Sequence, residues 1–317
     1  MVFALFSVLT ASGLCAAPLD TRGLLAAPFP ALGESPPGFF SASADVDLYL
    51  GQRARRHSGG GRVWTNLYYG DTRLKPKDGD KMNPSFYGIQ LGFDTKKTHG
   101  VHSTCFLNVN QSKTDFSGGS STIDNYLIGY GRHVYLSMCH FSYIGSIGYD
   151  RYDITGGGTG DGLQVNLFGE FGLDFNLGRW VIKPFYALQY DFLYHGNIGG
   201  SPVVVSDWNA HSLQQLFGMR LIWGATHSLE LQSRAVWVHE FLDNPPPFYH
   251  ARFSPMQGVH TPAIMFYEGN TGRDWAWLGI GAKWECAYNV YLFFDYDVLL
   301  NERHTSHIGS VGFQLGW

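Results

Sequence analysis

From residue 62 to residue 317 the chain repeats one pattern of apolar and polar positions. In segments of about 9 to 14 residues every second residue is apolar or aromatic, and clusters of Gly, Asp, Asn, Pro and Ser separate the segments. In residues 163–175, for example, Leu163, Val165 and Leu167 alternate with Gln164 and Asn166. Because side chains alternate between the two faces of a β-strand, the pattern predicts strands with one apolar face and one largely polar face.

Proline interrupts the pattern in one segment. Residues 180–192 alternate like the others, but Pro184 falls on their apolar face. Because proline has no backbone N–H to donate, we expect a local bulge there or a shifted register.

Counting the segments gives about twelve strands. Their centres are Leu67, Ile89, Leu107, Ile128, Ile147, Leu167, Ala187, Phe217, Ala235, Ile280, Phe294 and Val311. Connections after the even-numbered strands are short, whereas those after the first, third, fifth, seventh and ninth strands are longer. An even count, with short turns on one rim and long loops on the other, is typical of a closed barrel in a bacterial outer membrane.

Composition and charge exclude other classes of protein. The chain has 317 residues, of which 44% are hydrophobic, 16% aromatic and only 15% charged, so it is not a disordered chain. A net charge of −4 gives no electrostatic support for a nucleic-acid partner. After residue 20 no apolar run reaches the roughly 18 residues of a spanning helix, which excludes a helical membrane bundle.

The region before the strands divides into three parts. Residues 1–17 are apolar and end in Cys15-Ala16-Ala17, which is typical of a signal peptide. Because a basic start is missing, the alternatives are a true start further upstream or a buried segment. Residues 18–40 are rich in Pro, Gly, Ala and Ser and suit a linker. Residues 41–57 place acids early and Arg53, Arg55 and Arg56 late, which favours a short helix because it complements the macrodipole.

Aromatic residues gather near the strand ends, as in the girdles at the two membrane interfaces. The residues concerned are Tyr68 with Tyr69, Tyr149 with Tyr152, Trp275 with Trp277, and Trp284. The last strand ends the chain on an aromatic residue, and Val311, Phe313, Leu315 and Trp317 share one face. We expect this strand to pair with the first one and close the sheet.

No pattern of catalytic, cofactor-binding or metal-binding residues is present in the sequence. His239-Glu240 is not followed by the second His of an HExxH motif, and residues 156–162 lack the Lys-Ser/Thr of a P-loop. We therefore predict no catalytic residue, no cofactor and no metal ligand. Six charged residues on the polar strand faces are predicted to line the lumen with a structural role: Arg220, Glu230, Arg234, Asp191, Asp295 and Asp297.

Over residues 41–317 the chain resembles the translocator (β-domain) of autotransporters, the type V secretion proteins of bacteria. The resemblance rests on Gly61-Arg62-Val63-Trp64, on residues 87–94, on residues 237–241 (Trp-Val-His-Glu-Phe) and on residues 307–317. It implies an all-β fold: a closed antiparallel transmembrane barrel of about twelve strands at residues 62–317, with residues 41–57 as a helix in the lumen. It also implies location in the outer membrane of a bacterium, with membrane lipids and the barrel assembly machinery as partners. Val311, Phe313, Leu315 and Trp317 would then be the assembly signal of a monomeric barrel.

The sequence departs from that family in two ways. At most about 40 residues separate the signal peptide from the expected helix, too few for a stacked-repeat passenger. Either the gene encodes a barrel without a passenger, or the chain is a fragment of a longer product. No Asn occurs in residues 41–57, so self-cleavage at an Asn-Asn pair is not expected. The leading hypothesis is a translocator barrel that anchors or exports an N-terminal segment and is not an enzyme. The alternatives are a channel without a passenger, an outer-membrane enzyme with a Ser/His or Asp/His pair at one rim, and a soluble β-sandwich.

Overall fold

The computed structural model describes residues 61–74, 83–97, 101–116, 119–136, 138–154, 158–196, 198–199, 203–205, 207–242, 249–253, 264–266, 273–302 and 304–317. The predicted signal peptide, linker and helix, residues 1–57, lie outside the described residues.

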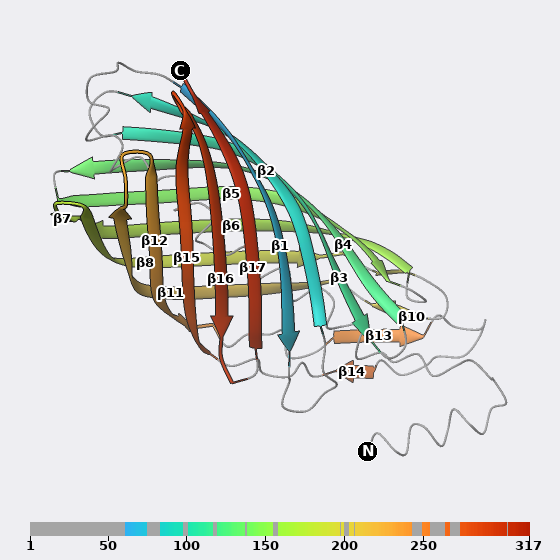
Figure 1. Cartoon of the computed structure of the whole chain (residues 1–317). Helices are drawn as coiled ribbons and strands as arrows, with labels where there is room; N and C mark the ends of the chain where they lie inside the picture. The colour runs from blue at the N-terminus through green and yellow to red at the C-terminus, as the bar shows by residue number, and fades with distance from the viewer. Residues whose placement is uncertain are drawn as a thin grey trace.

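Twelve long strands form the wall of a barrel. They are β1 (Gly61–Leu74), β2 (Asn83–Lys97), β3 (Val101–Phe116), β4 (Gly119–Leu136), β5 (Cys139–Ile154), β6 (Gly158–Leu173), β8 (Trp180–His195), β11 (Trp208–Gly224), β12 (Leu229–Glu240), β15 (Asp274–Ala287), β16 (Val290–Leu300) and β17 (His304–Gly316). Neighbours in this series pair antiparallel, and β1 also pairs with β17 (Figure 1). The predicted closed, twelve-stranded antiparallel barrel is therefore confirmed.

Five short strands accompany the wall. β7 (Phe175–Leu177) continues the line of β6 and pairs with β8. β9 (Ile198–Gly199) and β10 (Val203–Val205) lie in the connection between β8 and β11, whereas β13 (Tyr249–Phe253) and β14 (Ile264–Phe266) lie between β12 and β15. Because β10 pairs with β13, the two longest connections of the barrel meet at one end, as Figure 1 shows.

The two rims of the barrel differ in their connections. On one rim only residues 98–100, 137–138, 174–179, 225–228 and 288–289 separate the long strands, and Trp317 N–H donates to the Gly61 carbonyl at 3.2 Å. Short turns identify this rim as periplasmic. The opposite rim carries the two longest connections. The expected long loops there are wrong after β3 and β5, which are followed by residues 117–118 and 155–157 alone, because those strands extend further than the alternation indicated.

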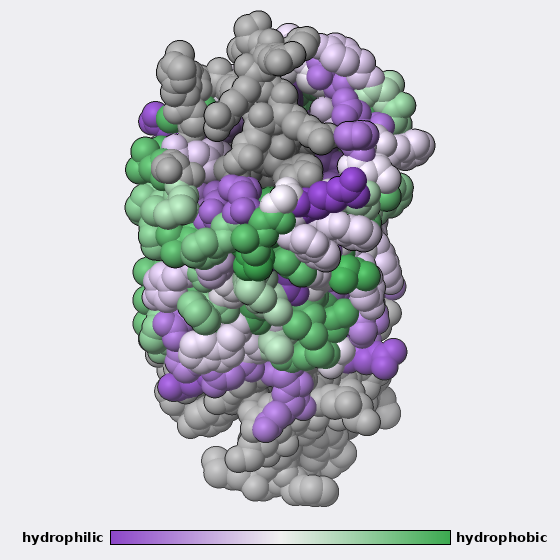
Figure 2. Space-filling model, turned by 60° about the vertical axis from the view of Figure 1, so that its left-hand side comes forward, coloured by the Kyte–Doolittle hydropathy of each residue, from purple (hydrophilic) through white to green (hydrophobic). Residues whose placement is uncertain are grey.

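The outer face of the wall is apolar. Leu67 and Leu167 are each 52% exposed, whereas Gln164, three positions before Leu167 and on the opposite face, is 3% exposed. Hydrophobic residues gather across the middle of the visible wall in Figure 2, with hydrophilic residues toward both ends. Exposed apolar surface on this scale is stable where acyl chains replace water, so the outer face is the one that contacts lipid.

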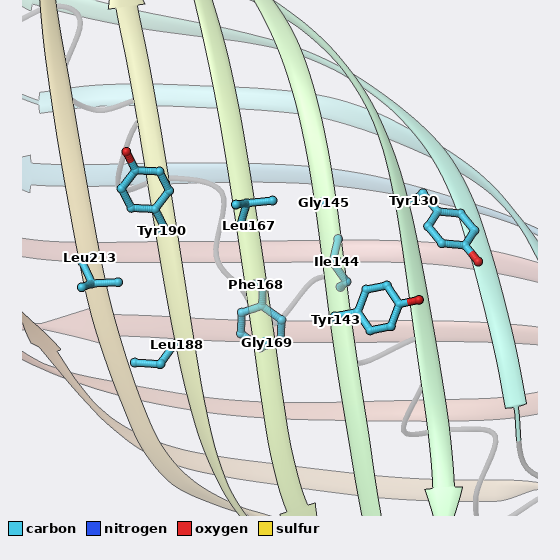
Figure 3. Close-up of a pocket in the computed structure, with 10 residues that line it drawn as sticks. All are labelled: Tyr130, Tyr143, Ile144, Gly145, Leu167, Phe168, Gly169, Leu188, Tyr190 and Leu213. Carbon is cyan, nitrogen blue, oxygen red and sulfur yellow. The ribbon is translucent and has the colours of Figure 1, made fainter.

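One part of this outer face is hollowed. Around Gly145 on β5 and Gly169 on β6, larger apolar side chains leave an open groove (Figure 3). The groove contains no charged lining residue, so it belongs to the apolar outer face of the wall and not to the lumen.

Glycines on the inner face make room for large neighbours. A Cβ atom at Gly129 of β4 would lie 2.0 Å from the ring of Phe106, its partner on β3. The same arrangement places Trp64 over Gly92 and Phe293 over Gly312. Each of these rings lies flat across the adjacent strand, so the inner wall is packed while the strands keep their register.

Pro184 does not produce the expected bulge. The β6–β8 ladder ends at Gly172–Phe185 and resumes in the same register at Phe175–Ile182 of β7. Because proline has no N–H, the ladder lacks a bond at this point but is not shifted. The register irregularity recorded between described strands lies instead at Glu285/Ala287, where β15 turns toward β16.

The expected aromatic girdles need a correction. Tyr69, Tyr149 and Trp284 face outward as girdle residues do, but Tyr68, Tyr152 and Trp277 are buried on the inner side. Trp275 also packs against the inner cluster that contains Trp277. Tyr68 and Tyr69 are adjacent in sequence, so strand alternation must send them to opposite faces.

Replacing Gly129 by leucine should destabilise the barrel by about 1–3 kcal/mol, because the new side chain must displace the packed Phe106 ring. Urea unfolding in detergent micelles would measure the change. Gly309→Leu is the matched control, since a Cβ there meets nothing within 4 Å. Equal unfolding midpoints for the two variants would contradict this account of the inner wall.

Candidate functional site

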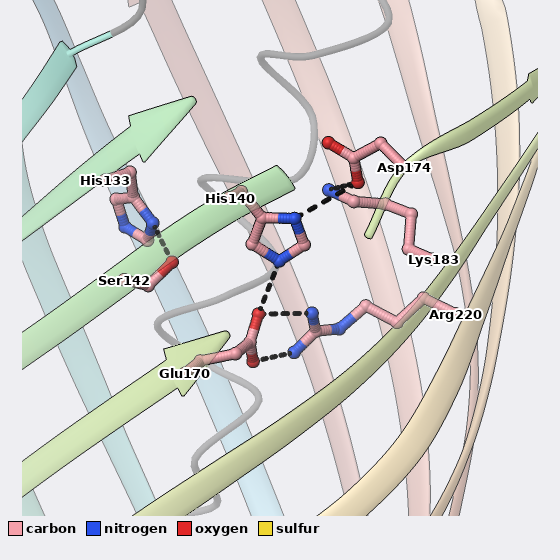
Figure 4. A network of polar contacts seen from close by, with 7 residues as sticks. All are labelled: His133, His140, Ser142, Glu170, Asp174, Lys183 and Arg220. Atoms are coloured by element: carbon pink, nitrogen blue, oxygen red, sulfur yellow. Dashed lines mark hydrogen bonds and ion pairs between the residues drawn. The ribbon is translucent and has the colours of Figure 1, made fainter. Parts of the chain in front are cut away.

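An ion pair braces the inner wall near the periplasmic rim. Arg220 of β11 donates two hydrogen bonds to Glu170 of β6, at 2.8 and 2.7 Å. Both side chains are buried, and the Arg220 guanidinium also lies 3.9 Å from the centre of the Phe185 ring on the intervening strand β8 (Figure 4). The two charges therefore join strands that are not hydrogen-bonded to each other.

His140 extends this brace to a second pair of charges. Its Nε2 lies 3.0 Å from Glu170 Oε1, and its Nδ1 lies 3.1 Å from Asp174 Oδ1. Lys183 Nζ is 3.5 Å from the same Asp174 oxygen (Figure 4). The imidazole can bridge two carboxylates because Gly172, its partner on β6, leaves space above the strand. We call Glu170, Arg220, His140, Asp174 and Lys183 the periplasmic brace.

A second bridge crosses strand β15. Arg234 Nε of β12 donates to Asp297 Oδ1 of β16 at 2.6 Å, and Trp277 Nε1 donates to the same oxygen at 2.8 Å. In the register Gly279 stands between Arg234 and Asp297. A Cβ at Gly279 would clash with both side chains, so glycine allows the ion pair to form across it.

The six residues predicted to line the lumen all lie on the inner face. Arg220, Arg234 and Asp297 form the ion pairs above, and Asp295 accepts from Gln232 Nε2 at 2.7 Å. Asp191 accepts from Gln189 at 2.7 Å. Glu230 is buried opposite Lys283 of β15. The six residues thus belong to separate clusters around the lumen and do not converge on one centre.

Carboxamides cover another part of the inner wall. Asn125 Nδ2 donates to Asp150 and to Gln164 Oε1, at 2.5 and 3.0 Å. Asn66 and Gln90 face each other across β1 and β2, are each 4% exposed, and carry side-chain oxygens without a hydrogen-bond partner. Among the described residues, this part of the inner wall thus carries both paired and unpaired polar groups.

The inner wall is less polar than the alternation indicated. Buried apolar residues form a cluster on β8, β11, β12 and β15: Phe185, Ala187, Leu216, Val236, Val238 and Trp277. A second cluster on β1, β3, β4 and β5 contains Trp64, Phe106, Leu127 and Ile144, and Phe168 packs against both. Side chains fill much of the interior of a barrel with few strands, and apolar ones do so without needing hydrogen-bond partners.

The terminal strand turns its apolar residues toward lipid. Val311, Phe313 and Leu315 are about 40% exposed on the outer face of β17, and Trp317 is 61% exposed. The Trp317 ring stacks on Phe93 with ring centres 6.0 Å apart. The end of the chain is therefore held against β2, beside the strand β1 that closes the barrel.

An Asp/His pair lies at the outer rim, but on the outer face. His239 Nδ1 is 2.9 Å from Asp274 Oδ1, which also accepts from Trp237 Nε1 at 3.0 Å. The His239 ring packs against Trp237 and Phe241. The aromatic surroundings and outward direction suit a membrane-interface girdle rather than a substrate pocket.

Other kinds of site are not found in the part of the chain that the structure describes. No group of three or more His, Cys, Asp or Glu residues there could hold a metal ion. Cys105, Cys139 and Cys286 are free thiols. The described residues also contain no helix that is long and apolar enough to cross a membrane.

The alternation of residues 163–175 and 180–192 puts Glu170, Asp174 and Lys183 on the polar strand faces. It does not show that they meet, and the sequence analysis did not single out His140. The only signal for His140 in the sequence is its place in the alternation of inward and outward side chains, since it is adjacent to the outward Phe141 on β5. Parity gives the face of the wall but not the partner, since the register between strands is set by contacts far apart in sequence.

Replacing Arg220 by methionine should cost about 3–5 kcal/mol of stability, because it leaves Glu170 as an uncompensated buried charge. The double variant Glu170→Met/Arg220→Met should recover most of that loss. Urea unfolding in micelles would compare them. If the double variant were as unstable as the single one, the ion pair would not be what braces β6 to β11.

Comparison with known proteins agrees with this architecture. A family model described as the autotransporter beta-domain matches residues 63–297. A search of curated proteins finds no match.

Among solved structures, the translocator domain of the autotransporter NalP from Neisseria meningitidis is 15% identical, with a TM-score of 0.65 over 87% of this chain and 96% of that one. The transport unit of AIDA-I from Escherichia coli is 14% identical, with a TM-score of 0.62 over 80% of this chain and 90% of that one. The beta domain of the Bordetella autotransporter Brka is 14% identical, with a TM-score of 0.61 over 82% of this chain and all of that one. At these identities the likeness concerns the fold. With the family match over most of its length, the chain belongs to the autotransporter beta-domain family and is an outer-membrane translocator barrel of that type.

Proposed function

We propose that this barrel holds an N-terminal segment of its own chain in the lumen, and so anchors or exports what that segment carries. The observation that supports this most is the charge of the inner wall. Among the side chains that the structure describes, its carboxylates outnumber its cations Arg62, Lys183, Arg220, Arg234 and Lys283. The carboxylates are Asp94, Asp150, Glu170, Asp174, Asp191, Glu230, Glu240, Glu285, Asp295 and Asp297. The segment that precedes β1 carries Arg53, Arg55 and Arg56.

Three of these carboxylates lie in the outer half of the lumen, and they make it the favoured binding place for the three arginines of the N-terminal segment. Within the described strands Asp150, Asp191 and Glu240 form no ion pair, in contrast to Glu170, Asp174 and Asp297. Asp191 and Glu240 flank Ser212, which is the register partner of Asp191 and donates to Glu240. Buried carboxylates are stabilised by a cation within a few ångströms, and a guanidinium offers several donors at once.

We also propose that the barrel is a monomer without catalytic activity. Glu170 with Arg220 and Arg234 with Asp297 are engaged in braces between strands, and the Asp/His pair at the outer rim faces the membrane interface among aromatic rings. Neither arrangement offers a nucleophile beside a general base. We expect Asp274→Asn to leave the barrel folded and its transport unchanged.

The outward apolar face of β17 supports a role in assembly. Val311, Phe313, Leu315 and Trp317 present a continuous apolar surface on the outer face of β17 and the residue that follows it. We propose that the barrel assembly machinery reads this surface before β17 pairs with β1.

Removing residues 1–60 should open the lumen. Single-channel recordings in planar bilayers would compare the full chain with the truncated one, and we expect conductance to rise on truncation. Unchanged conductance would overturn the proposal that the segment occupies the lumen, and a full chain already open would favour the alternative of a channel without a passenger.

Charge reversal tests the electrostatic part separately. The variant Arg53→Glu/Arg55→Glu/Arg56→Glu should raise conductance of the full-length chain, because the inner carboxylates would repel the segment. The matched variant with three lysines keeps the charge and should stay closed. If reversal had no effect, the arginines would not be what holds the segment.

Deleting Trp317 should reduce the yield of assembled barrel in the outer membrane, measured as heat-modifiable migration of membrane fractions on gels. Trp284→Ala, which removes an outward aromatic residue of similar exposure from β15, is the control. Equal yields for both variants would argue against a terminal assembly signal.

A further inference from the structure

The groove on the outer face of the wall has a defined shape and composition. It measures about 500 Å³, within the range of pockets that hold small ligands. Its lining is Tyr130, Tyr143, Ile144, Gly145, Leu167, Phe168, Gly169, Leu188, Tyr190 and Leu213. Side chains of the outer face, among them Tyr143, Leu167 and Leu188, surround the two glycines in Figure 3.

Two glycines create the groove. A Cβ at Gly169 would meet nothing within 4 Å, and one at Gly145 would meet only Leu167, at 3.5 Å. These glycines therefore differ from the inner ones, whose space is filled by a neighbouring ring. The space above Gly145 and Gly169 is therefore open on the lipid-facing side of the wall.

The register gives the groove a direction. Tyr130, Gly145, Leu167, Tyr190 and Leu213 are successive partners on β4, β5, β6, β8 and β11. Strand spacing makes this row about 19 Å long. Tyr130 lies six residues from the periplasmic end of β4 and Leu213 eleven from that of β11. The groove thus runs obliquely from the periplasmic side toward the middle of the membrane. A tilted acyl chain of a lipid in the periplasmic leaflet has the same direction.

A cation stands at the periplasmic end of the groove. Arg132 is on the outer face of β4, between Tyr130 and Val134, and is the register partner of the groove residue Tyr143. Its Nε is buried and has no hydrogen-bond partner among the residues that the structure describes. An arginine on the lipid face is unfavourable unless an anion compensates it, and a phosphate suits the planar guanidinium.

We propose that this site binds one phospholipid of the periplasmic leaflet, with its phosphate on Arg132 and one acyl chain along the groove. The apolar lining matches the chain, the cation matches the phosphate, and the direction matches a lipid whose headgroup lies at the periplasmic interface. A second copy of the barrel fits the site less well, because its outer face would place an apolar band in the groove but no anion beside Arg132.

Native mass spectrometry of the full-length protein, released from detergent micelles after addition of phosphatidylglycerol, tests the proposal. We expect one retained lipid per chain. Gly169→Leu, which fills the groove, and Arg132→Leu, which removes the cation, should each weaken retention by about tenfold. Arg132→Lys should keep most of it. Gly145→Leu is a second groove-filling variant should Gly169→Leu not give a heat-modifiable barrel.

Two control variants match these changes elsewhere on the outer face. Gly309→Leu fills open space on β17, and Arg151→Leu removes an outward arginine near the outer rim. Both should retain lipid like the unaltered chain. Diacylglycerol, which lacks the phosphate, should bind weakly, and lipid A should not compete.

If Gly169→Leu or Gly145→Leu retained as much lipid as the control Gly309→Leu, the groove would not be where the acyl chain binds. Equal retention by Arg132→Leu and Arg151→Leu would overturn the phosphate contact. Preference for lipid A, or a dimer in place of a lipid adduct, would overturn the identity of the occupant.

Discussion

Pairing of backbone N–H and C=O groups inside a lipid layer is the constraint on which the rest of this structure depends. Water cannot satisfy these groups in the acyl region, so a sheet that crosses it must have no free edge. In this chain the pairing of β1 with β17, from Arg62–Gly316 to Leu74–His304, removes the last edge. Closure then divides every strand into a face toward lipid and a face toward the lumen. The period-two pattern of the sequence follows from that division.

Closure also explains the interior. A closed wall fixes the distance between strands, so large inner side chains fit only where a neighbouring residue is small. Glycine provides that space under Phe106 and His140, and between Arg234 and Asp297. The charged braces lie across strands, so they stiffen the wall without occupying its centre. The same arrangement leaves a lumen whose described wall is acidic and partly apolar.

Parity along the strands was enough to predict much of the fold. All twelve strand centres fall inside long strands, and the six charged residues assigned to the polar faces lie on the inner wall. Alternation carries this information because each strand is amphipathic by itself. The error at Tyr68, Tyr152 and Trp277 came from aromatic content near the strand ends, whereas alternation places these residues on the inner face.

Contacts between strands could not be predicted in the same way. Glu170 and Arg220 are fifty residues apart, and their pairing depends on the registers of β6, β8 and β11 together. His140 gave no signal of its own, and the groove at Gly145 and Gly169 appears only when adjacent strands are set side by side. Pro184 was expected to disturb the register, but a missing hydrogen bond at one position is tolerated when the neighbouring pairs on both sides hold the strands.

Cross-linking of β1 to β17 tests the closure of the barrel most directly. In a chain whose own cysteines are replaced by alanine, cysteines at Leu67 and Val311, which are register partners, should form a disulfide in the membrane-assembled protein. Cysteines at Leu67 and Phe294, which lies one strand further on β16, should not. Cross-linking of the second pair, or of neither pair in a folded barrel, would contradict the closed wall.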